Sequence, residues 1–129
     1  FFLEAGSLYK VHNGNLLFHA CVPLNADGSL KEVDVYGKTY KGRALYDVME
    51  RHVRAAFFSR DEEERRRGRD MLWYLWLGQG SPLFAKSKMA TFELYLIADK
   101  AARKEVKNPL LHLDRRRGRG LEHLPRFRA

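Results

Sequence analysis

The chain has 129 residues, of which 45% are hydrophobic and 12% aromatic, and its formal net charge is +8. This composition is sufficient for one packed domain, whereas the single cysteine, Cys21, excludes an intramolecular disulfide and a cysteine-rich zinc site. No apolar run approaches the roughly 18 residues of a membrane span, and the start lacks a signal-peptide pattern, so we expect no membrane partner and a cytoplasmic, reducing setting. Because the first residues, FFLEAGS, lack a methionine, we expect a piece of a longer protein.

The first predicted element is a β-hairpin over residues 7–22. Asn13-Gly14 is a strong signal for a type I′ turn, and it separates arms at Leu8–Val11 and Leu16–Val22. The second arm is apolar almost throughout, which is typical of a central strand buried on both faces. His19 lies in this second arm, so we expect its side chain to be buried. Further along, Asp27-Gly28 and Gly37 predict turns between short polar strands.

Three helices follow the strands in the prediction. Apolar residues at spacings of three and four predict an amphipathic helix over residues 43–58, and a second over 62–77 that stops at Gly78. We expect Trp73 and Trp76 of the second helix to fill the core. Helical spacing resumes over residues 88–100 after a loop. The sequence therefore predicts an α+β fold.

The positive charge is unevenly distributed along the chain. Residues 110–129 carry a net charge of +4, half of the total. In the second cluster, RDEEERRRGRD (60–70), acidic and basic residues recur four apart, which predicts a solvated helix face with paired charges. No aromatic residue alternates with these arginines as a base-stacking platform requires. We therefore do not expect nucleic acid as a partner. The alternative function is a small basic nucleic-acid-binding protein, and a third is an inert helical scaffold.

Four separated segments carry a family resemblance. They are GSLYKVHNGNLLFHACVPLNADGSLKEV, KGRALYDVMERHVRAAF, WYLWLGQGSPLFAKSKMATFELYLIADK and KEVKNP. In this order they resemble class III fructose-1,6-bisphosphatase, a bacterial enzyme of the calcineurin-like metallophosphoesterase superfamily, over about residues 2–109. That family's proteins are several times longer. The resemblance implies that residues 1–109 are a fragment of the catalytic region, with sheet strands followed by about three helices.

The resemblance also implies a function in gluconeogenesis. The parent enzyme would hydrolyse fructose 1,6-bisphosphate to fructose 6-phosphate and phosphate, using a hydroxide activated by two divalent metal ions, with manganese the expected metal. FHACVP is similar to a metal-ligand motif of the superfamily, which makes His19 a metal ligand. The alternative is a core histidine with a backbone hydrogen bond. Ala20 stands where the family usually has glycine.

Other parts of the implied site lie outside this chain. The family's Asp-x-His, Gly-Asp-x-x-Asp and Gly-Asn-His-Glu motifs do not occur in the sequence. No complete catalytic set is present, so we expect the chain alone to be inactive and to lack the rest of the parent enzyme. Lys86 and Lys88 are candidate sugar-phosphate ligands; the alternative is solvated loop lysines. Ala85 and Ala90 stand where the family usually has glycine and threonine.

The last twenty residues do not resemble the family. Synonymous codons can be chosen for residues 110–114 that encode Tyr-Tyr-Thr-Trp when they are read one base later. With further such choices, the same reading frame continues into an acidic, helix-forming stretch that resembles the family. We therefore predict that residues 110–129 are a frameshifted, disordered tail. The rival interpretation is a genuine basic tail that binds nucleic acid.

Overall fold

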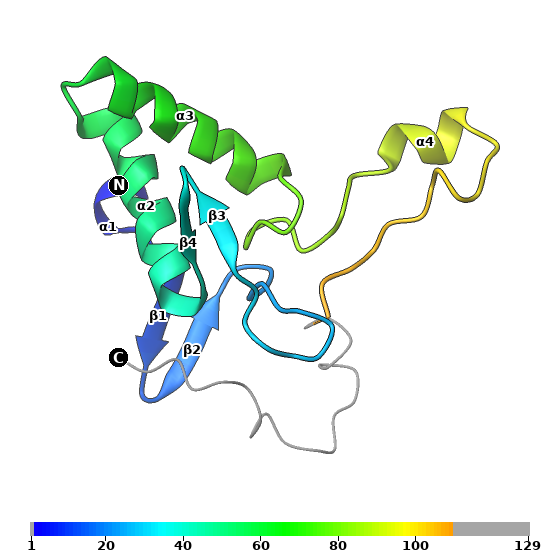
Figure 1. Ribbon diagram of the computed structural model, residues 1–129, viewed down its shortest axis with the longest axis horizontal. Coiled ribbons are helices and arrows are strands. Elements are labelled where there is room, and N and C mark those ends of the chain that lie inside the picture. The colour runs from blue at the N-terminus through cyan, green and yellow to red at the C-terminus, as the bar shows by residue number, and fades with distance from the viewer. Residues whose placement is uncertain (1, 110–129) are drawn as a thin grey trace.

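A computed structural model describes residues 2–109 of the chain. Its elements in order are α1 (Phe2–Ala5), β1 (Tyr9–His12), β2 (Asn15–Phe18), β3 (Val33–Val35), β4 (Lys38–Tyr40), α2 (Gly42–Phe58), α3 (Glu62–Leu77) and α4 (Thr91–Leu96). The predictions made for residues 110–129 lie outside the described part. The mixed α+β class is confirmed, with helices α2 and α3 beside two small hairpins (Figure 1).

The first hairpin forms around Asn13-Gly14 as predicted. Both turn residues have positive φ, 49° and 75°, and β1 pairs antiparallel with β2. The second arm is shorter than expected, because β2 ends at Phe18 and not at Val22. Its burial was also predicted wrongly: Leu17 and Phe18 are exposed. Within residues 2–109 the sheet has only two strands, so no third strand or second layer covers the apolar side chains of β2.

The second hairpin joins β3 to β4 through Tyr36-Gly37. Both residues have positive φ, and the Tyr36 hydroxyl donates to the Arg67 carbonyl oxygen at 2.6 Å. The Tyr36 ring meets the edge of the His52 ring, with centroids 4.8 Å apart. The turn predicted at Gly37 thereby ties this hairpin to both long helices.

The core lies where α2 and α3 pack on the hairpins. Leu45, Met49 and Val53 from α2 meet Met71 and Leu75 from α3, and the cluster also takes in Leu8 and Val35. The predicted helix boundaries at 58, 62 and 77 are confirmed. The helices approach closely at Gly68. A Cβ atom there would lie 2.4 Å from the His52 carbonyl oxygen, so only glycine fits.

The two tryptophans were assigned to the core wrongly. Trp73 and Trp76 are 68% and 70% exposed. At 100° per residue, Met71 and Leu75 share the face of α3 that meets α2, whereas position 73 lies on the far side of the helix and position 76 flanks the packed face. Gly78 does end α3, but its φ of −74° is ordinary. A side chain is excluded there because its Cβ would lie 2.5 Å from the Tyr74 carbonyl oxygen.

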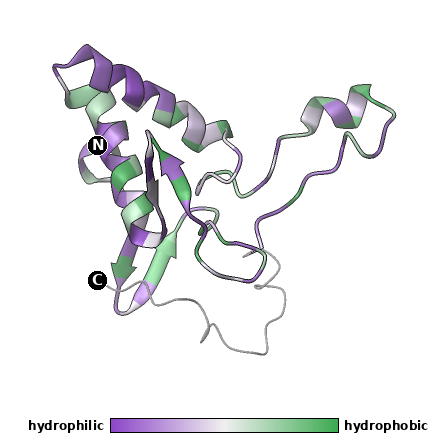
Figure 2. Cartoon of the chain, viewed as in Figure 1, coloured by the Kyte–Doolittle hydropathy of each residue, from purple (hydrophilic) through white to green (hydrophobic). Residues whose placement is uncertain are grey.

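The charged first half of α3 is a solvated face, as predicted, and appears as the most hydrophilic stretch of that helix (Figure 2). Arg66 and Arg67 contact Glu63 at 2.8 and 3.1 Å, and Arg69 contacts Glu62 at 3.0 Å. Asp61 does not pair with an arginine four residues on, because its carboxylate caps the helix by accepting from the N–H groups of Glu63 and Glu64.

The helix predicted over residues 88–100 is reduced to six residues in α4. It lies on a long excursion away from α2 and α3 (Figure 1). None of its residues is buried, and its N-cap, Ala90, makes no side-chain cap. Short helices persist mainly through tertiary packing, so without a packed face the helical pattern is not extended past Leu96. Every helix in residues 2–109 is too short or too polar to cross a lipid bilayer.

Candidate functional site

His19 lies directly after β2, in a bend, and its side chain is exposed. The expectation of a buried histidine was therefore wrong. Because the strand ends at Phe18, the chain turns away from the hairpin before residue 19. An exposed imidazole is open to a ligand, which a core histidine satisfied by the backbone is not.

The turn that carries His19 is anchored at Cys21. The Cys21 N–H donates to the Pro82 carbonyl oxygen at 3.1 Å, and the Tyr46 hydroxyl donates to the Cys21 carbonyl oxygen at 2.8 Å. The thiol packs against the Ser81 carbonyl oxygen, with Sγ and O 3.7 Å apart. The FHACVP segment is thus joined to the loop that leads to the candidate phosphate ligands, two motifs sixty residues apart in sequence.

Cys21 itself is not a nucleophile in this arrangement. It is fully buried, and burial raises the pKa of its thiol to about 11, against a smaller lowering by a backbone hydrogen bond from Ala85. A thiol with this pKa is protonated near neutral pH, whereas reactive cysteines are thiolates. Its contribution is structural.

The loop after α3 is rigidly held at Ser81. This residue is fully buried, and its hydroxyl donates to the Leu75 carbonyl oxygen at 2.6 Å and accepts from the Leu83 N–H at 3.1 Å. Ala85 follows with a positive φ of 53°, and Ala20 on the facing segment has a φ of 57°. Both alanines that stand at expected glycine positions therefore adopt the left-handed backbone that favours glycine.

The two candidate phosphate lysines both contact the segment that precedes Pro109. Lys86 Nζ lies 2.7 Å from a Glu105 carboxylate oxygen, and Lys88 Nζ donates to the Ala102 carbonyl oxygen. The other Glu105 oxygen accepts from the Ala90 N–H at 2.9 Å. This backbone hydrogen bond, followed by the one from Lys86, lowers the pKa of Glu105. Phosphate binding by the lysines stays a prediction, and it would compete with these internal contacts.

The described residues fit one ligand position of a metal centre and not a complete centre. Within residues 2–109 no three histidine, cysteine or carboxylate side chains cluster to hold an ion. His19 is accessible and is carried by an anchored turn, which suits a ligand whose partners come from elsewhere. The role of His19 as a ligand stays a prediction. The sequence analysis did not single out Tyr46, although its spacing to Met49 and Val53 on the predicted helix was an available signal.

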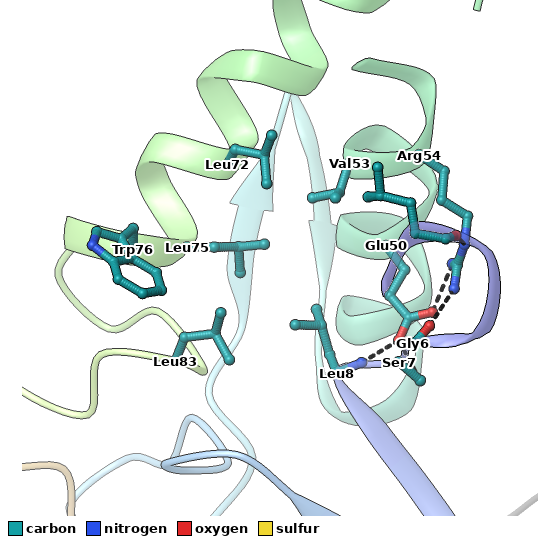
Figure 3. Close-up of a pocket in the computed structure, with 11 residues that line it drawn as sticks. Gly6, Ser7, Leu8, Glu50, Val53, Arg54, Leu72, Leu75, Trp76 and Leu83 are labelled. Carbon is teal, nitrogen blue, oxygen red and sulfur yellow. Dashed lines mark hydrogen bonds and ion pairs between the residues drawn. The ribbon is translucent and has the colours of Figure 1, made fainter. Parts of the chain in front are cut away.

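A separate cavity of about 160 Å³ lies between α2, α3 and the residues before β1 (Figure 3). Its walls are mainly the leucines 3, 8, 72, 75 and 83 with Val53 and Trp76. The polar edge is the ion pair between Arg54 and Glu50 at 2.8 Å, and Glu50 also accepts from the Leu8 N–H at 2.5 Å. The Ser7 hydroxyl also donates to Glu50 at this edge, and the cavity includes neither His19 nor the two lysines.

The comparison with known proteins agrees with these motifs. The chain is 54% identical over 110 residues to fructose-1,6-bisphosphatase class 3 of Clostridium botulinum (strain Langeland), which covers 84% of this chain and 16% of that protein. It is 51% identical over 114 residues to fructose-1,6-bisphosphatase class 3 of Clostridioides difficile (strain 630), covering 88% of this chain and 17% of that protein.

The chain thus spans about one sixth of the length of these curated relatives. No solved structure matches it significantly. The family model described as Firmicute fructose-1,6-bisphosphatase matches residues 1–120, nearly the whole chain. The chain therefore belongs to the Firmicute fructose-1,6-bisphosphatase family.

Proposed function

We propose that this chain is part of the catalytic region of a cytoplasmic class III fructose-1,6-bisphosphatase with a calcineurin-like metallophosphoesterase core. The parent hydrolyses the 1-phosphate of fructose 1,6-bisphosphate, giving fructose 6-phosphate and phosphate in gluconeogenesis. This proposal rests on the sequence identity to class 3 relatives. It is supported by the backbone hydrogen bond from Cys21 to Pro82, which connects the His19 turn to the Ser81–Ala85 loop within the matched residues.

In this proposal His19 supplies one imidazole ligand to a two-metal centre, with manganese as the metal. Bound divalent ions supply Lewis-acid and water-activating chemistry for phosphate ester hydrolysis. The chain's own part is to present the imidazole on a turn that is hydrogen-bonded to the loop preceding Lys86 and Lys88. Lysine ammonium groups act on phosphate as point charges, so each would add attraction for the sugar phosphate.

The proposal predicts no bisphosphatase activity for the chain by itself, because one histidine cannot hold two metal ions. The test measures phosphate release from fructose 1,6-bisphosphate with added Mn²⁺. Release above the level of a heat-denatured sample would contradict the expected division of the site between this segment and the rest of the protein.

A full-length hybrid tests the role of His19 directly. Residues 1–109 of this chain would replace the matching segment of the Clostridium botulinum relative, and His19→Ala would be compared with His12→Ala, which changes an exposed histidine of β1. Loss of a ligand should weaken Mn²⁺ binding by more than about tenfold and lower kcat with it. If His19→Ala matches His12→Ala in both quantities, His19 is not a metal ligand.

A further inference from the structure

Tyr46 is the one fully buried tyrosine among the described residues, and its hydroxyl reaches the turn that carries His19. It lies on α2 within the core, where its ring packs at 5.5 Å from the ring of Tyr9. Its hydroxyl donates to the Cys21 carbonyl oxygen at 2.8 Å. Burial raises the pKa of this hydroxyl far above neutrality, so the proton needed for donation is present throughout the physiological pH range.

The turn needs stabilising hydrogen bonds because one of its residues has an unfavourable backbone conformation. Ala20 has a φ of 57°, a conformation that a side chain disfavours, and it lies between His19 and the anchored Cys21. The Cys21 N–H is bound by Pro82 and the Cys21 carbonyl by Tyr46, so the peptide groups on both sides of this residue are fixed. His19 is two residues away, and its side chain is otherwise exposed.

We infer that Tyr46 is a positioning residue, which sets the place of the His19 imidazole by holding the Cys21 carbonyl group. This inference rests on the proposed role of His19 as a metal ligand. Residues that orient a ligand through the backbone act on metal affinity without touching the metal, in the way that outer-shell partners do. The ring of Tyr46 belongs to the core, whereas its hydroxyl serves the turn, and the two roles are separable by removing the oxygen alone.

The experiment uses the full-length hybrid with Tyr46→Phe, His19→Ala and the double variant. The readouts are the Mn²⁺ dissociation constant by calorimetry, kcat and KM, and the melting temperature. We expect Tyr46→Phe to weaken Mn²⁺ binding roughly tenfold and to lower kcat while KM for fructose 1,6-bisphosphate changes little. In the His19→Ala background, Tyr46→Phe should cause no further loss of Mn²⁺ affinity, because it acts through that side chain.

Tyr9→Phe is the matched control. It removes a hydroxyl that donates to Asp47 at 2.9 Å, from the ring that packs on Tyr46, without touching the turn. It should leave Mn²⁺ affinity unchanged. A second variant, Ala20→Gly, removes the unfavourable positive φ of the turn, so that the turn depends less on the Tyr46 hydroxyl. Adding Ala20→Gly to Tyr46→Phe should therefore restore part of the lost Mn²⁺ affinity. If no affinity is restored, Tyr46 does not act through this turn.

The outcomes separate the inference from the function on which it rests. If His19→Ala weakens Mn²⁺ binding but Tyr46→Phe lowers only the melting temperature, Tyr46 is a core residue and the inference is overturned while the ligand role stands. If His19→Ala leaves Mn²⁺ affinity intact, the proposed ligand role fails, and the inference fails with it.

Discussion

Two alanines, Ala20 and Ala85, adopt left-handed backbone conformations on facing segments of the candidate site. For a residue with a Cβ this conformation costs about 1–2 kcal/mol relative to ordinary helical or extended backbone. We therefore predict that Ala20→Gly and Ala85→Gly each raise the free energy of unfolding by roughly 0.5–1 kcal/mol, after the greater flexibility of glycine in the unfolded chain is subtracted. Urea denaturation measures both.

Ala44 provides the control at the residue scale. It is exposed within α2 and its own φ is negative, so Ala44→Gly should lower the free energy of unfolding by about 1 kcal/mol. If glycine destabilises positions 20 and 85 as it does position 44, backbone strain is absent from the turn and the loop.

At the scale of elements, the packing of α2 against α3 depends on Gly68. Its missing side chain lets the backbone of α3 reach the His52 carbonyl oxygen and Ala56. Gly68→Ala should lower the free energy of unfolding by about 1–3 kcal/mol, the usual range for overpacking. Arg69→Ala, a change at the exposed neighbouring position, should stay within about 0.5 kcal/mol. Equal effects of the two variants would mean that the helices can separate without loss.

The segment before β1 is held on α2 by Glu50, which gives this element a pH dependence. Although burial acts to raise the pKa of Glu50, hydrogen bonds from Ser7, Arg54 and the Leu8 N–H together lower it. A carboxyl group whose pKa is lower when folded stabilises the protein above its unfolded pKa, and this stabilisation is lost as pH falls through the folded pKa. Stability should therefore decline below about pH 4.5.

Glu50→Gln should remove this part of the acid-dependent decline, since the amide does not titrate. Melting temperatures between pH 3 and 7 give the comparison, with Glu93→Gln on α4 as the control for a lost carboxylate. A slope below pH 4.5 that is identical in all three proteins would assign the acid sensitivity to other groups.

At the scale of the whole molecule, α4 is an unpacked apolar helix. Phe92, Tyr95 and Leu96 are between 77% and 84% exposed. Exposed apolar groups of this size promote association, so we predict that the isolated chain self-associates and unfolds with low cooperativity. Replacing the three residues by serine should shift sedimentation velocity profiles toward the monomer, whereas Arg65→Ser on α3 should not. A monomeric chain with a sharp, high-temperature transition would show that the segment is self-sufficient.

Local rules were enough where a structure depends on a few adjacent residues. Asn13-Gly14 determined the first hairpin because a type I′ turn requires positive φ at both positions. The periodicity of α2 and α3 determined their boundaries, and the motif around His19 indicated the family. These features follow from backbone conformation and residue spacing, which the chain carries without reference to distant parts.

Tertiary structure decided which apolar residues are buried and how the motifs meet. Trp73, Trp76 and β2 are apolar but largely exposed, because burial depends on a partner surface, and residues 2–109 provide one mainly for the face of α3 that carries Met71 and Leu75. The helix predicted over residues 88–100 shortened to α4 for the same reason. Cys21 forms backbone hydrogen bonds with the Pro82 carbonyl oxygen and with the Tyr46 hydroxyl. Both contacts connect residues far apart in sequence, and no local sequence pattern encodes them.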